Sequence, residues 1–137
     1  MLDAHLCPKL SNFELSRREQ DNIVPGLQLA DAARYMTPEK IKDKGNPYMK
    51  ECDIFSLGIV LWVIAMQEKP YVLIKSFQKI ENFVMEGNRQ IPADENIPIK
   101  YQNIMNKAWD NNSNYRPVAS IMYEELSKCL EDDDVYL

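Results

Sequence analysis

The sequence predicts a single, mainly α-helical domain, and three observations lead to this fold class. Residues 53–62 (Asp-Ile-Phe-Ser-Leu-Gly-Ile-Val-Leu-Trp) are almost all apolar, as is typical of a helix that is buried on every side. Further segments repeat apolar residues at intervals of three and four, whereas strand-like runs occur only near the N-terminus. With 137 residues, 45% of them hydrophobic, the chain is long enough for one core.

The beginning of the chain is expected to hold little helix. Residues 2–15 are consistent with two short strands around a turn at Cys7-Pro8. Residues 16–36 are polar and show no period, and a stretch of this length in a compact domain is usually functional or disordered. Pro38 suits the first turn of a short helix, because its missing N–H needs no partner there, and residues 44–47 (Lys-Gly-Asn-Pro) end that helix.

The buried helix, expected at about 49–66, is followed by three amphipathic helices at about 73–85, 99–109 and 118–130. Their inward faces are expected to carry Ile74, Phe77, Ile80 and Val84 in the first, Tyr101, Ile104, Met105 and Ala108 in the second, and Val118, Ile121, Met122, Leu126 and Cys129 in the third. The next residues are acidic and have little apolar surface to bury, so residues 131–137 are expected to form a solvated acidic tail.

Charge and cysteine usage exclude several classes of function. A net charge of −5 argues against a nucleic-acid partner, which needs clustered Lys and Arg. Cys7, Cys52 and Cys129 lie far apart and His5 stands alone, so neither a disulfide framework nor a metal site is expected. The longest apolar run, residues 57–66, is much shorter than the roughly 20 residues of a membrane span, and the first residues do not show the basic-then-apolar pattern of a signal peptide. A cytoplasmic location is therefore expected.

Four segments in a fixed order resemble the C-terminal lobe of protein kinases. Asn12-Phe13-Glu14 stands where that family carries D-F-G, and residues 35–39 (Tyr-Met-Thr-Pro-Glu) are similar to its A-P-E segment. Residues 53–62 resemble the central helix of the lobe, and Trp109 with Arg116-Pro117 resembles the W…RP segment. The resemblance covers residues 2 to about 130, so a partial kinase-like domain at 1–130 is expected, with residues 16–36 as its activation loop.

The resemblance implies a lobe without its catalytic parts. The Gly-rich loop, the strand lysine, its glutamate partner and the H-R-D-x-x-x-x-N loop are absent from these 137 residues. Met1 would then stand one strand into a lobe, and we expect the chain to be a truncated gene model, an isoform or a fragment.

Glu39 and Arg116 are the first candidate site residues. In the kinase family the A-P-E glutamate pairs with the arginine of the RP segment, and the planar guanidinium can grip a carboxylate with two parallel hydrogen bonds. The alternative is two unrelated surface charges. The resemblance gives Asp53 the role of holding the backbone of the catalytic loop. The alternative is an exposed acid in the first turn of a helix, where it favours the helix dipole. Trp109 is expected to be structural.

Asn12 decides the expectation about activity. The aspartate of the family at this position binds Mg²⁺ that bridges the nucleotide phosphates, and the neutral asparagine carbonyl is a poorer ligand. Glu14 could supply a substitute carboxylate, and Phe13 is expected to pack. The Asn-Phe-Glu segment is similar to the degenerate segments of mixed lineage kinase domain-like pseudokinases in the tyrosine-kinase-like group. No cofactor is therefore expected for this chain, although the family uses ATP and Mg²⁺.

Three functions remain open. The chain is expected to be an inactive, pseudokinase-type module that acts in signalling through a protein partner. The alternative is the C-terminal part of an ATP-dependent serine/threonine or tyrosine kinase that is active only in a longer product. A third reading is a non-functional truncated product with an uncovered apolar helix face. Hydroxyls in or beside the loop (Ser11, Ser16, Tyr35 and Thr37) could carry phosphate near Arg17 and Arg18, or could simply be solvated.

Overall fold

The computed structural model describes residues 3–11, 13, 16, 34–43, 45, 47–90 and 96–133, without the side chains of 130–133. Its regular elements are helices, in the order α1 (Pro38–Lys42), α2 (Lys50–Met66), α3 (Phe77–Met85), α4 (Ile99–Ala108), the 3-10 helix η3 (Ser113–Tyr115) and α5 (Ala119–Asp133). The expected mainly α fold is thereby confirmed.

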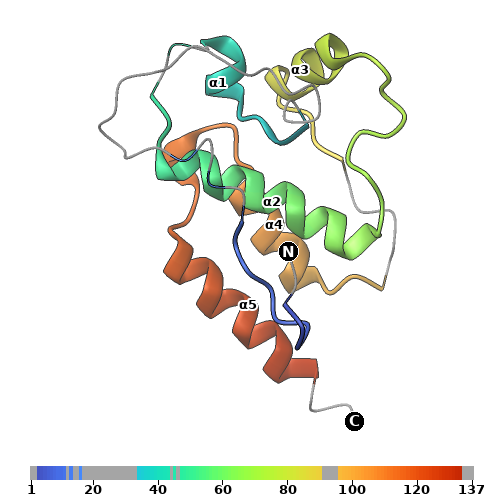
Figure 1. Ribbon diagram of the computed structural model, residues 1–137, viewed down its shortest axis with the longest axis vertical. Coiled ribbons are helices and arrows are strands. Elements are labelled where there is room, and N and C mark those ends of the chain that lie inside the picture. The colour runs from blue at the N-terminus through green and yellow to red at the C-terminus, as the bar shows by residue number, and fades with distance from the viewer. Residues whose placement is uncertain are drawn as a thin grey trace.

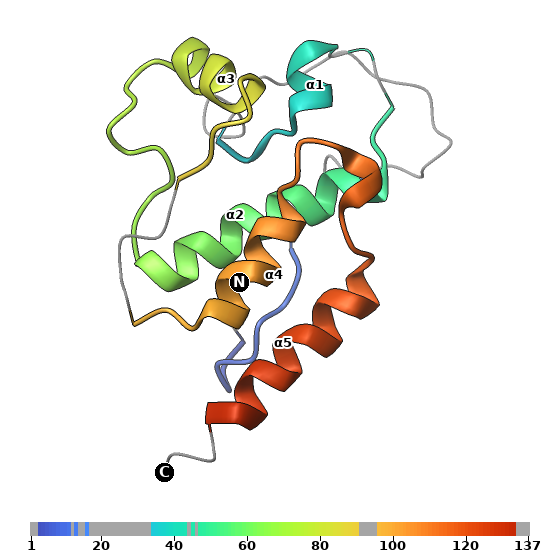
Figure 2. The same cartoon turned by 180° about the vertical axis from the view of Figure 1, so that it is seen from behind.

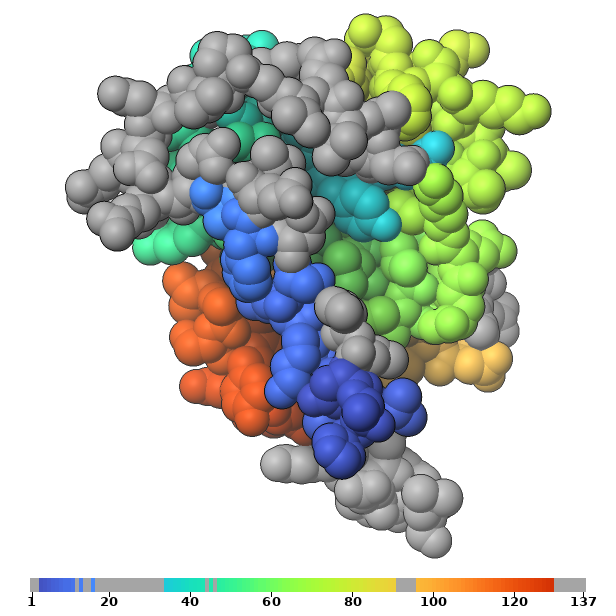
Figure 3. Space-filling view, viewed as in Figure 1, coloured from blue at the N-terminus to red at the C-terminus, as the bar shows by residue number. Residues whose placement is uncertain are grey.

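Helix α2 crosses the middle of the molecule, and the other helices are arranged around it (Figure 1). Helix α4 packs along α2, and α5 packs on α4, while α1 and α3 contact each other at the opposite end of the molecule (Figures 1 and 2). Figure 3 shows the N-terminal segment lying across the front of the molecule near α5. The long helix α2 thus connects the α1–α3 end with the α4–α5 end.

The core lies between α2 and α4, which approach each other closely at Gly58. A Cβ atom at this position would lie 3.0 Å from the Cβ of Ala108 and 3.2 Å from the backbone nitrogen of Trp109. Phe55, Ile59 and Trp62 of α2 are buried there, together with residues from α3, α4 and α5 (Ile80, Val84, Ile104, Met105, Ala108 and Met122). The Tyr101 hydroxyl adds a polar link, because it donates to the Leu61 carbonyl at 2.8 Å.

Local sequence explains where α1 and α2 begin and end. Pro38 occupies the first turn of α1, and the Thr37 side-chain oxygen caps that helix by accepting from the Lys40 backbone N–H. Two acids in the first turn of α2, Glu51 and Asp53, favour the helix dipole. Helix α2 ends at Gln67, which takes the left-handed conformation and donates its backbone N–H to the Val63 carbonyl.

The expected N-terminal hairpin is not formed among the described residues. Only an isolated bridge occurs there, at Pro8, and the turn lies earlier, where the Leu6 N–H donates to the Asp3 carbonyl at 3.0 Å. Proline has no N–H for a strand ladder, and an isolated two-stranded hairpin is marginal in water. The expected strands at 2–15 were therefore wrong for the part of that segment that is described.

Two helix boundaries differ from expectation. Helix α3 begins at Phe77 rather than near Leu73, because residues 71–73 form a turn in which Tyr71 has a φ of 55°. Helix α5 continues to Asp133, three residues into the segment expected to be a tail. Residues 134–137 lie outside the described residues. Helices α2 and α4 lie within about a residue of the predicted bounds.

The prediction that α2 is buried on every side was wrong. Its face with Asp53, Val60 and Ile64 is open, and Ile64 is 56% exposed. Val118, just before α5, and Ile121, in its first turn, are also exposed, although both were expected to point inward. The reason is that α5 packs on α4 along a narrow stripe around Met122, so apolar residues at the edge of that stripe stay uncovered.

Gly58 yields a test of the α2–α4 contact. We expect Gly58→Val to lower the free energy of unfolding by about 1–3 kcal/mol, because the new side chain forces the helices apart. The matched control is Val60→Ile, which adds volume on the exposed side of the same helix and should change the value by less than about 0.5 kcal/mol. Urea unfolding followed by circular dichroism measures both, and equal effects would contradict the close approach.

Candidate functional site

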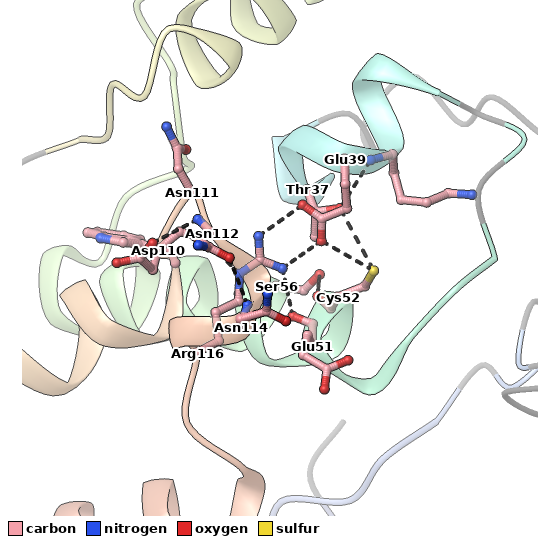
Figure 4. A network of polar contacts seen from close by, with 12 residues as sticks. Thr37, Glu39, Glu51, Cys52, Ser56, Asp110, Asn111, Asn112, Asn114 and Arg116 are labelled. Carbon is pink, nitrogen blue, oxygen red and sulfur yellow. Dashed lines mark hydrogen bonds and ion pairs between the residues drawn. The ribbon is translucent and has the colours of Figure 1, made fainter.

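Arg116 and Glu39 form a two-pronged ion pair at the junction of α1, α2 and η3 (Figure 4). Nη1 of Arg116 donates to Oε1 of Glu39 at 2.6 Å, and Nη2 donates to Oε2 at 2.9 Å. The Arg116 side chain is fully buried, whereas the Glu39 side chain is 22% exposed. The structure thus brings together two residues that are 77 positions apart in the sequence.

The remaining donors of Arg116 bind backbone carbonyls. Nε donates to the Asp110 carbonyl at 2.8 Å, and Nη1 also donates to the Glu51 carbonyl at 3.0 Å. One guanidinium therefore joins α1, the first turn of α2 and the loop after α4. A buried charge that is paired and bonded in this way does not carry the desolvation cost of a stranded one.

The loop before Arg116 is held in shape by short-range side-chain bonds. The Asp110 side chain accepts from the Asn112 N–H at 2.8 Å, and the Asn112 side chain accepts from the Asn114 N–H at 3.1 Å (Figure 4). Asp and Asn favour such turns because their short side chains reach backbone N–H groups two residues on. The polar run 110–114 therefore presents Arg116 at the end of η3.

Glu39 also accepts a hydrogen bond from a thiol. Burial by itself raises the pKa of Glu39, but the hydrogen bonds and charge of Arg116 outweigh it, so the pKa lies below its ordinary value. The Cys52 thiol donates to Oε1 of Glu39 at 3.6 Å and accepts from the Thr37 hydroxyl at 3.8 Å. Burial raises the pKa of Cys52, so this thiol stays protonated as a donor.

Sequence reasoning missed Arg89, a second arginine of this cluster, which is half-buried. Its guanidinium carbon lies 4.8 Å from the centre of the Phe55 ring, and that of Arg116 lies 5.0 Å from the same ring. Arg89 donates to the Trp109 carbonyl at 3.1 Å and to the Val84 carbonyl at 3.1 Å. Burial lowers its pKa. The only sequence signal was its place just after the Glu86-Gly87-Asn88 turn that ends α3.

Trp109 is buried beside this pair of arginines, and its indole N–H donates to the Asn106 side chain at 3.2 Å. Its backbone carbonyl is the one that binds Arg89. The backbone nitrogen and Cβ of Trp109 also face Gly58. Trp109 therefore contacts both the α2–α4 crossing and the arginine cluster.

A pocket of about 280 Å³ adjoins the ion pair and lies over the start of α2. It is lined by Tyr35, Met36, Thr37, Lys40, Tyr48, Cys52, Asp53 and Ser56. The Lys40 ammonium sits 4.1 Å from the centre of the Tyr48 ring, and the Ser56 hydroxyl donates to the Tyr35 carbonyl at 3.0 Å. The pocket combines one cation, one carboxylate and several hydroxyls.

Asp53 is exposed at the rim of this pocket, and within the described ranges no hydrogen bond to its carboxylate occurs. Asp53 lies in the first turn of α2, where it favours the helix dipole, and its role in holding a catalytic loop stays a prediction. Thr37, in contrast, is only 2% exposed and its hydroxyl donates to the Cys52 sulfur, so it is not a solvated loop hydroxyl. Phe13 is 63% exposed and does not pack as expected. Asn12 and Glu14 lie outside the described residues.

Residues 1–126 match the family model described as protein tyrosine and serine/threonine kinase. The chain belongs to the protein kinase family. Its helical fold is that of a kinase C-terminal lobe.

Two serine/threonine-protein kinases of Arabidopsis thaliana are 28% and 29% identical to this kinase-family chain over 134 residues, which are 96% of this chain and 22% of each relative. A dual specificity protein kinase of Dictyostelium discoideum is 26% identical over 132 residues, 96% of this chain and 18% of the relative. The chain thus spans about a fifth of the length of these kinases.

The described part of this kinase lobe carries neither a candidate metal site nor a candidate membrane span. No group of three or more His, Cys, Asp or Glu side chains there is arranged to hold a metal ion. None of the helices within those ranges has the length and apolar character needed to cross a bilayer.

The ion pair predicts a large stability effect. We expect Arg116→Ala to lower the free energy of unfolding by about 3–5 kcal/mol, because it strands the Glu39 carboxylate in a half-buried site. The matched control is Lys107→Ala, which breaks the exposed Lys107–Glu125 pair (2.8 Å) and should cost about 0–1 kcal/mol. Replacing both partners, with Arg116→Met and Glu39→Leu, should recover part of the loss. Equal effects of the two alanine substitutions in urea unfolding would contradict the geometry.

The lowered pKa of Glu39 predicts that the free energy of unfolding depends on pH. Its folded pKa lies below the ordinary value of 4.5, so the unfolded chain binds more protons between these two values. The pair therefore stabilises fully above about pH 5.5, and this contribution is lost as the pH falls through the folded pKa. We expect Glu39→Gln to flatten the fall in unfolding free energy below pH 5.5, measured by urea unfolding at a series of pH values. Parallel pH profiles of the two proteins would refute this assignment.

Proposed function

We propose that this chain is a pseudokinase-type lobe that acts in signalling through contacts with other proteins and does not itself transfer phosphate. The observation that carries the proposal is a contrast within one chain. The residues that organise the lobe, Glu39 and Arg116, are present and paired, whereas the position of the metal-binding aspartate is Asn12.

The chemistry of the donor set supports inactivity. Mg²⁺ prefers charged oxygen ligands in octahedral geometry, and Asn12 offers only a neutral carbonyl. Glu14 is the one nearby carboxylate in the Asn-Phe-Glu segment, and a single displaced ligand does not replace the family's arrangement of aspartate and asparagine. The residues at hand thus fit Mg²⁺-ATP poorly.

The Asn-Phe-Glu segment also supports placing the chain near the mixed lineage kinase domain-like pseudokinases of the tyrosine-kinase-like group. In such a lobe the fold is retained while catalysis is lost, so a protein surface is what remains to carry function. A cytoplasmic location would suit such a signalling role.

A second candidate is the C-terminal part of an active serine/threonine or tyrosine kinase in a longer product. The match to the kinase family model over residues 1–126 favours it, as do the relatives that are named protein kinases. In that case the missing catalytic loop would come from sequence that precedes Met1. Sequencing full-length transcripts for an in-frame H-R-D-x-x-x-x-N segment separates the two candidates, because such a segment would favour the enzyme.

The proposal predicts no phosphate transfer by this chain. We expect purified protein with Mg²⁺ and γ-labelled ATP to incorporate no label above that of a heat-denatured sample, and we expect Mg²⁺-ATP to leave the melting temperature unchanged. The matched variant is Asn12→Ala, which should behave identically in both assays. Labelling of the unmodified chain that disappears in Asn12→Ala would overturn the proposal.

A further inference from the structure

The segment between α2 and the middle of α3 presents apolar and basic side chains together on the surface. We name this the 69–79 surface, and it consists of the exposed residues Lys69, Val72, Leu73, Lys75, Phe77 and Lys79. Leu73 is 90% exposed and Val72 is 50% exposed. In Figure 3 the loop and α3 project from the body of the molecule (yellow-green).

Leu73 and Val72 point outward because the turn that carries them is held in place. Tyr71 is buried with a φ of 55°, and its N–H donates to the Gln90 side chain at 2.5 Å. Nη1 of Arg34 donates to the carbonyl of Pro70 at 2.6 Å and to that of Tyr71 at 3.1 Å. Since Tyr71 occupies the interior and its backbone is bonded on both sides, the next two residues are displayed to solvent.

The charge of this surface is opposite to that of the rest of the chain. Residues 69–79 contain three lysines and no acid, whereas the whole chain has a net charge of −5. Arg34 adds a further cation, since its guanidinium carbon lies 5.7 Å from the centre of the Phe77 ring. An occupant that complements this surface therefore needs several acids beside apolar side chains.

The chain itself contains a segment of that chemistry. Residues 131–137 read Glu-Asp-Asp-Asp-Val-Tyr-Leu, with four acids followed by three apolar or aromatic residues. The four acids equal in number the four cations of the surface, which are its three lysines and Arg34. The last three residues match the apolar part formed by Val72, Leu73 and Phe77. Charges would set orientation and encounter, while apolar burial would supply the affinity.

The geometry favours a second copy over the same molecule as the source of this segment. Helix α3 and the C-terminal end of α5 lie at opposite ends of the long axis (Figure 1). Helix α5, with 15 residues, is about 22 Å long by itself, and four further residues can span at most about 14 Å. A segment beginning at the far end of α5 therefore cannot turn back to α3 within one molecule.

We propose that the 69–79 surface binds the acidic segment 131–137 of a second copy of this chain. The contact is head-to-tail, because each copy uses a different surface on its two sides, so it can build rings or open chains. This proposal rests on the proposed function, because it names a second copy of the chain as the protein that the lobe contacts.

The test is self-association of the full chain, measured by sedimentation velocity over a concentration series. We expect association that weakens with added salt, because the contact pairs exposed charges. Lys75→Glu with Lys79→Glu should weaken it by about tenfold or more, since like charges then face each other. The matched control, Lys42→Glu with Lys50→Glu, makes the same charge change at exposed sites of α1 and α2 outside both proposed surfaces and should leave association unchanged.

A charge swap identifies the occupant. The variant carrying Asp132→Lys, Asp133→Lys and Asp134→Lys should not associate alone, but should associate when mixed with the variant carrying Lys75→Glu and Lys79→Glu. A synthetic peptide of residues 131–137 should compete with the association of the unmodified chain. Melting temperatures of all variants establish that they are folded.

Several results would overturn the proposal. These are a chain that stays monomeric at every concentration, association that survives the Lys75 and Lys79 changes, or mixed variants that do not associate. Lysine-dependent binding to phosphatidylserine vesicles by a chain that remains monomeric would assign the surface to a lipid instead. None of these readouts depends on phosphate transfer, so failure here and failure of the proposed function are distinguishable.

Discussion

The buried ion pair between Arg116 and Glu39 is the interaction on which the rest of the lobe depends. Arg116 uses its donors on a carboxylate of α1, a carbonyl of α2 and a carbonyl of the loop after α4. These three segments are distant in the sequence and are joined here by one side chain. Lysine could not make this arrangement, because a single ammonium cannot supply a planar fork to two carboxylate oxygens and two carbonyls at once.

The two sides of α2 lie in different environments. One side is packed on α4, where Gly58 allows a close approach, and the other side carries Asp53, Val60 and Ile64 toward solvent. The pocket over the start of α2 lies on the exposed side, next to the buried Thr37 and Cys52. The same helix therefore stabilises the lobe and lines a pocket with polar and apolar walls.

Much of the fold could be predicted from the periodicity of apolar residues in the sequence. The errors of that prediction have identifiable causes. Helices α2 and α4 lie close to prediction because their apolar pattern is long and uninterrupted. The start of α3 was missed because Tyr71 adopts a left-handed conformation that no apolar spacing indicates. Val118 and Ile121 show that a pattern gives the apolar face but not how much of it a neighbour covers. The pairing of Glu39 with Arg116 came from family resemblance, and Arg89 was missed because nothing in the sequence distinguishes an arginine that packs on an aromatic ring from one on the surface.

Two guanidinium groups contact the Phe55 ring, and this has a consequence for how the lobe opens. Arg116 connects the ring to α1, while Arg89 connects it to the end of α3 and to Trp109. Local fluctuations that expose either arginine must also uncover the shared aromatic face. Backbone amides in α1, in the first half of α2 and at the α3 C-terminus should therefore exchange hydrogen as one cooperative unit rather than fray independently.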